Sequence, residues 1–91
     1  MTESLAKASV LIAARARQIS AEGQFALGYV QPVPSPCVSV CRMTAQGHHC
    51  EGCFRTLDEI STWSQADGAA RRAIWAAALR RARVPLPLEL T

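Results

Sequence analysis

Four cysteines fall within a window of 17 residues, and the chain contains no others. They form two close pairs, with three residues between Cys37 and Cys41 and two between Cys50 and Cys53. Structural zinc sites use ligand pairs of this kind, because two thiolates from one tight turn can occupy two corners of a tetrahedron. The spacer between the pairs is long enough for a hairpin. The pattern therefore predicts one metal centre held by all four thiolates.

Zinc is the favoured metal, since it suits a closed four-thiolate site in a short module. An iron–sulfur cluster is the alternative, although the common ferredoxin runs place three cysteines in closer succession. His48 or His49 could replace one cysteine as a ligand, but solvated loop histidines are the simpler interpretation. A redox Cys-x-x-Cys pair would require the strand–helix setting of a larger α/β fold, which the sequence does not predict.

Three residues beside the cysteines are expected to support the site. Gly52 lies inside the second pair, where it would relieve backbone strain as the chain wraps the metal. Arg42 and Arg55 follow Cys41 and Cys53 closely, and their positive charges would offset those of the thiolates. These residues form the expected surroundings of the metal.

The elements that position the cysteines follow from the flanking sequence. Residues 38–50 are a plausible hairpin with cysteines at both ends. Thr56 and Glu59 form a capping-box pattern that starts a helix. A second cap is expected at Ser64, followed by an alanine- and arginine-rich helix that ends near Arg83. The fold class is therefore mainly α, with a small metal-bound β-hairpin and two C-terminal helices.

The N-terminal third is expected to be a helical docking arm. The apolar spacing predicts a helix from Ser4 to about Ser20. Three prolines between residues 31 and 36 predict an extended linker. The expected organisation is an arm over 1–30, a linker over 31–36, a four-cysteine module with its helices over 37–84, and a tail over 85–91. The arm and one C-terminal tryptophan supply the expected partner contacts: Leu5, Ile12, Ile19, Phe25, Tyr29 and Trp75.

The length, charge and apolar content of the chain bear on its partners and its location. The chain has 91 residues and a formal charge of +3, so a nucleic-acid partner is possible but not favoured. The longest apolar stretch near the N-terminus is too short to span a bilayer, and the same region makes a poor signal peptide. A cytoplasmic location is therefore expected, where clustered cysteines are expected to be metal ligands or redox groups rather than disulfides.

The stretch from Ser35 to about Leu79 resembles a known family of short bacterial proteins. The matching segments are SPCVSVCRM at residues 35–43, CEGCFRTLDEI at 50–60 and WS at 63–64. The family is domain-of-unknown-function family 1289, whose members are often labelled predicted iron–sulfur proteins. The resemblance implies that the four cysteines act together, and it adds weight to an iron–sulfur cluster.

Three functions are compatible with these features, and no catalytic constellation is evident, so an enzyme is not expected. The first is a non-catalytic accessory or adaptor subunit that docks on a larger protein and is stabilised by its metal. The second is an iron–sulfur electron-transfer or redox-sensing protein. The third is nucleic-acid binding through the basic residues of the last helix, which are Arg71, Arg72, Arg80, Arg81 and Arg83.

Overall fold

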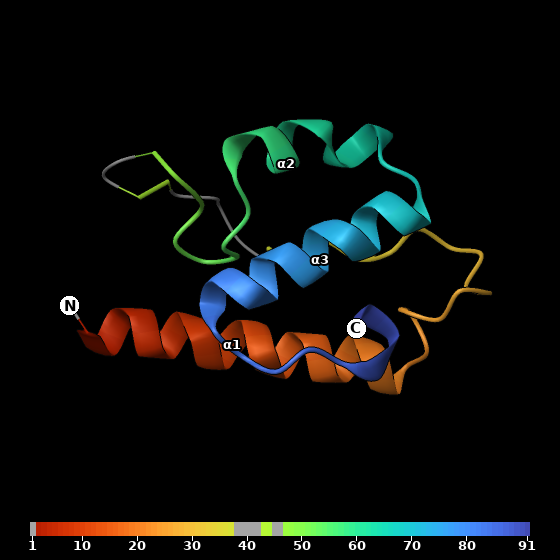
Figure 1. Ribbon diagram of the computed structural model, residues 1–91, viewed down its shortest axis with the longest axis horizontal. Coiled ribbons are helices and arrows are strands. Elements are labelled where there is room, and N and C mark those ends of the chain that lie inside the picture. Colours follow the sequence, from red (N-terminus) through yellow and green to blue (C-terminus); the bar gives the residue numbers. More distant parts are fainter. Residues whose placement is uncertain (1, 38–42, 45–46) are drawn as a thin grey trace.

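The computed structural model describes residues 2–37, 43–44 and 47–91, with side chains described from residue 8 onward. Its elements are α1 (Thr2–Ala21), α2 (Leu57–Thr62), the 3-10 turn η1 (Trp63–Gln65), α3 (Gly68–Ala82) and the 3-10 turn η2 (Leu88–Leu90). Figure 1 shows α3 between α1 and α2, with the C-terminal tail running back along α1. The expectation of a mainly helical protein is confirmed.

Little β-structure is present in the described part of the chain. It consists of one isolated antiparallel bridge between Met43 and Cys50. Next to this bridge, the Thr44 amide donates to the His49 carbonyl at 2.8 Å. Residues 38–42 and 45–46 of the expected hairpin lie outside the described residues, so the hairpin stays a prediction.

The core lies between α1 and α3. Helix α1 contributes Ile12, Ala16 and Ile19, each 2% exposed. Trp75 of α3 is fully buried, and its ring makes an edge-to-face contact with that of Phe25, with the ring centroids 5.2 Å apart. This T-shaped contact anchors the turn after α1 to the middle of α3.

This packing corrects four of the six expected partner contacts. Ile12, Ile19, Phe25 and Trp75 were expected to contact a partner, but they are buried in the chain's own core. In the folded chain these four side chains are occupied by intramolecular contacts, so they are not available to contact a partner. Tyr29 is partly exposed and its hydroxyl accepts a hydrogen bond from Gln24, whereas the side chain of Leu5 lies outside the described part.

The two C-terminal helices begin at different kinds of cap. The capping box of α2 is confirmed: the Glu59 amide donates to Thr56 Oγ1 at 3.1 Å, and the Thr56 amide donates to Glu59 Oε1 at 2.9 Å. The predicted cap at Ser64 is wrong, because Ser64 lies inside η1. Asp67 caps α3 instead, and its Oδ1 accepts from the Ala70 amide at 2.8 Å.

Among the described residues, none of the helices has both the length and the apolar character that crossing a membrane would require.

Candidate metal centre

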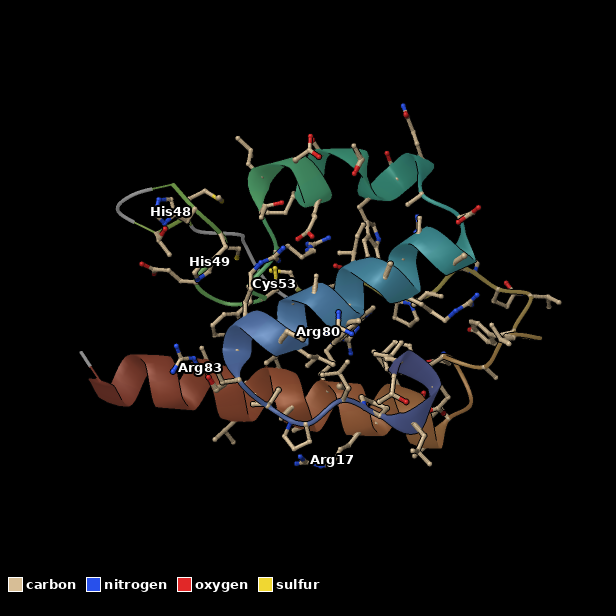
Figure 2. The ribbon with its side chains drawn as sticks, viewed as in Figure 1. Arg17, His48, His49, Cys53, Arg80 and Arg83 are labelled. Atoms are coloured by element: carbon tan, nitrogen blue, oxygen red, sulfur yellow. The ribbon has the colours of Figure 1, made fainter. Side chains whose placement is uncertain are left out.

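Three of the four cysteine sulfurs lie together. The Sγ atoms of Cys37, Cys50 and Cys53 are all within 4.8 Å of one another. Cys50 and Cys53 are fully buried, and Cys37 is partly exposed. Cys41, the fourth predicted ligand, lies outside the described residues. Figure 2 shows Cys53 close to the C-terminal half of α3.

The segment Cys50–Arg55, here called the cysteine loop, is closed by its own backbone. The Phe54 amide donates to the Cys50 carbonyl at 2.8 Å, and the Cys50 amide donates to the Arg55 carbonyl at 2.7 Å. The Gly52 amide points at the Cys50 sulfur at 3.4 Å. Amide donors of this kind support a thiolate at Cys50, as the outer groups around a metal site do.

Backbone strain in the cysteine loop lies at Phe54 rather than at Gly52. Phe54 has a φ of 62°, in the left-handed region, whereas Gly52 lies outside that region. The expected strain-relieving role of Gly52 is therefore wrong. A left-handed conformation costs a residue with a side chain about 1–2 kcal/mol. Phe54 is held there because its ring is buried and stacks on His49, with the ring centroids 5.5 Å apart.

Arg55 places a positive charge against the sulfur of Cys53. Its side chain is only 4% exposed, and its Nε donates to Cys53 Sγ at 3.3 Å. Burial is the main reason that the pKa of the Cys53 thiol lies above its ordinary value, and the hydrogen bonds and charge of Arg55 oppose that shift. A bound metal ion would reverse the balance, since a coordinating thiol is deprotonated. The other predicted compensating residue, Arg42, lies outside the described part.

Helix α3 holds the segment that leads to Cys37. The Trp75 indole nitrogen donates to the Pro34 carbonyl at 2.8 Å. Arg71 donates to the Val33 carbonyl at 3.1 Å and also to the Trp63 carbonyl. These contacts fix the proline segment that places Cys37 beside the cysteine loop.

Two guanidinium groups lie over the ring of Trp63. That of Arg55 is 5.1 Å from the ring centroid, and that of Arg71 is 4.7 Å away. Cation–π contacts of this kind favour a fixed position for both arginines. Trp63 therefore connects the cysteine loop with α3.

The two histidines take different positions. Among the described residues, neither His48 nor His49 belongs to the cysteine group. His48 is exposed, whereas His49 packs on Phe54. The pKa of His49 lies below its ordinary value, mainly because of burial. The charges of Arg81 and His48 lower this pKa further, whereas the negative charge of Glu51 raises it.

The chemistry of the donor set fits a soft metal. Three thiols converge, two of them shielded from water, and N–H groups from Gly52 and Arg55 point at sulfur. Thiolate ligands select zinc, copper(I) or iron–sulfur clusters over magnesium and calcium. Three residues of α3 near the cysteines, Arg71, Trp75 and Arg81, make contacts that could not be predicted from the sequence. These residues lie 22 to 41 positions from most of the groups they contact, so no local pattern could reveal them.

The chain is similar to bacterial proteins whose role is not known. It is 45% identical over 38 residues to the uncharacterized protein YdhL of Escherichia coli strain K12, and equally to YdhL of Shigella flexneri. The aligned part is 41% of this chain and 47% of each relative, so the chain spans about half the length of the curated relatives it matches. No solved structure matches the chain. Residues 35–82, just over half of the chain, match the model of one family. The chain therefore belongs to the family described as "Protein of unknown function (DUF1289)".

Proposed function

We propose that this protein is a small, non-catalytic metal-binding protein in which Cys37, Cys41, Cys50 and Cys53 hold a single zinc ion that stabilises the fold. The observation that carries the proposal is the convergence of three Sγ atoms within 4.8 Å of one another. Two of these thiols are fully buried. A buried, closed set of thiolates is typical of structural zinc rather than of a catalytic site with an open position.

The spacing of the sulfurs supports one ion rather than a cluster. With a zinc–sulfur bond of about 2.3 Å, the sulfurs of a tetrahedral site stand about 3.8 Å apart. The observed separations are compatible with that geometry. In a four-iron cluster each cysteine binds a different iron atom, which spreads the sulfurs over the outside of the cluster. The close group therefore favours zinc.

The electrostatic surroundings support the same conclusion. Four thiolates around a divalent ion leave a net negative charge in a partly buried site. Arg55 supplies a nearly buried positive charge in direct contact with Cys53 Sγ. Because buried charges are costly unless compensated, this pairing suits a centre that is anionic when filled.

The metal would act mainly through folding. The residues of the cysteine loop contribute few large side chains to the core besides Phe54. Small domains often depend on a metal for this reason, and the binding free energy then becomes folding free energy. Without the ion, the cysteine loop would lose the metal–sulfur bonds that connect Cys50 and Cys53 with the other ligands.

An accessory role would use residues of the expected docking arm other than the ones that the sequence singles out. Leu27 is 86% exposed and Val30 is 90% exposed, and both lie in the segment between α1 and the prolines. We assign this segment the contact with a larger protein. If so, a tagged wild-type chain should retain a partner that a Leu27→Ser, Val30→Ser double variant of equal stability loses. Retention by both chains would argue against this surface.

Fewer arginines are available to bind nucleic acid in the structure than the sequence suggests. Arg71 and Arg81 bind carbonyl and carboxylate groups of the chain itself. Arg80 in the last turn of α3 and Arg83, which directly follows that helix, remain exposed, and their labels stand apart in Figure 2. If they contacted phosphates, binding would weaken steeply as the salt concentration rises.

Elemental analysis of protein purified without oxygen tests the proposed function. We expect about one zinc per chain, by the four-thiolate argument, and a colourless solution. A brown protein that contains iron and acid-labile sulfide would replace this proposal with the electron-transfer or redox-sensing alternative.

A further inference from the structure

Arg81 reaches from the last turn of α3 to the cysteine loop. Its Nη1 donates to the Phe54 carbonyl at 2.7 Å and to Glu59 Oε1 at 2.7 Å. Its Nη2 donates to Glu59 Oε2 at 2.9 Å. The guanidinium therefore joins three parts of the chain: α3, the end of the cysteine loop and the first turn of α2.

A restraint on the Phe54 carbonyl would hold the backbone conformation of the cysteine loop. Phe54 follows Cys53 directly, and its amide closes the loop onto the Cys50 carbonyl. Its left-handed backbone must be held by its surroundings, because such a conformation is unfavourable for a residue with a side chain. A charge-assisted hydrogen bond to this carbonyl is a strong and directional restraint.

Glu59 fixes the direction of that restraint. Its carboxylate binds Arg81 through both oxygens, which orients the planar guanidinium. The same carboxylate accepts from the Thr56 amide in the capping box. The first turn of α2 therefore orients the Arg81 guanidinium toward the Phe54 carbonyl of the cysteine loop.

We propose that Arg81 is a positioning residue of the metal centre. It holds the cysteine loop in the conformation in which Cys50 and Cys53 present both sulfurs to one ion, and Glu59 orients it. This inference rests on the proposed function, because it assigns Arg81 a role toward the ion that the four cysteines hold.

The test compares metal binding by matched variants of the full chain. Cobalt(II) is the probe, since its absorption reports thiolate ligation, and zinc competition then gives the zinc affinity. Arg81→Met should weaken zinc binding about 10-fold, at the low end of the 10–100-fold effect of residues that orient metal ligands. Arg81→Lys keeps the charge but lacks the planar fork, so we expect an intermediate loss. Arg80→Met, the neighbouring exposed arginine, should change the affinity less than 2-fold, because it makes no contact with the loop among the described residues.

A second control separates positioning from general destabilisation. Ile19→Val removes one methylene from the core on α1, far from the loop in sequence. Under conditions where both variants are fully folded by circular dichroism, Arg81→Met should show an altered thiolate–cobalt spectrum, whereas Ile19→Val should keep the wild-type spectrum even where its lower stability weakens binding slightly. Wild-type affinity and spectrum in Arg81→Met, or an equal change in Ile19→Val, would overturn the inference. A wild-type chain that binds neither ion would instead overturn the proposed function on which it rests.

Discussion

Replacing Trp75 with Phe tests how strongly α3 holds the segment that leads to Cys37. Trp75 is fully buried, and its indole N–H donates to the Pro34 carbonyl at 2.8 Å. Phe keeps an aromatic ring against Phe25 but removes the donor. Leaving a partly buried carbonyl without its partner costs about 1 kcal/mol, at the low end of the usual range because Pro34 retains some access to water. The missing ring atoms leave a small cavity that costs about 1 kcal/mol more.

The expected destabilisation is therefore about 2 kcal/mol at an unchanged denaturant slope, measured by urea unfolding followed by circular dichroism. For a domain of this length, that corresponds to a fall in Tm of about 10 °C. Trp63→Phe is the matched control, because the Trp63 indole nitrogen makes no hydrogen bond within the described ranges and its ring is only partly buried. We expect a loss below about 1 kcal/mol there. Equal losses in both variants, or a loss below about 0.5 kcal/mol for Trp75→Phe, would show that the Trp75–Pro34 hydrogen bond does not hold this segment.

Three further predictions concern the caps and the cysteines. Burial alone would raise the pKa of Glu59, but the hydrogen bonds and charge of Arg81 and the Thr56 amide bring it below the ordinary value of 4.5. The stabilisation lost in Glu59→Gln should therefore be constant above about pH 5 and shrink as the pH falls through the lowered pKa, and a difference that grows in acid would contradict this sign. Asp67→Ala should lower stability by about 1 kcal/mol and Ser64→Ala by almost nothing, as measured by thermal melting; the reverse order would restore the cap predicted at Ser64. Cys50→Ser, or treatment with a strong chelator, should remove the metal and much of the folding free energy, since structural zinc contributes on the order of 10 kcal/mol; a circular-dichroism melt that neither treatment changes would argue against a structural metal.

Local patterns in the sequence predicted the helical elements well. The capping box at Thr56 can be recognised in the sequence because its two partners are three residues apart. At that spacing, each side chain can accept a hydrogen bond from the other residue's backbone amide. The paired cysteines can likewise be recognised from their close spacing, and three of the four sulfurs do converge. The second cap was misplaced because Ser64 and Asp67 are both good N-cap residues, and the choice between them depends on the turn η1.

Contacts between distant segments could not be predicted. The apolar residues of α1 suggest a docking face because nothing in the sequence indicates that α3 covers them. Arg81 looked like one member of a basic helix face, although its partners are Phe54 and Glu59 on other elements. Strain was expected at Gly52 on general grounds, whereas tertiary packing imposes it on Phe54.

X-ray absorption at the metal edge of the purified protein would show whether the four cysteines hold one metal ion. We expect zinc with four sulfur neighbours at about 2.3 Å and no second metal atom nearby. An iron edge with a short metal–metal distance, or a zinc shell made mainly of nitrogen and oxygen, would contradict this expectation.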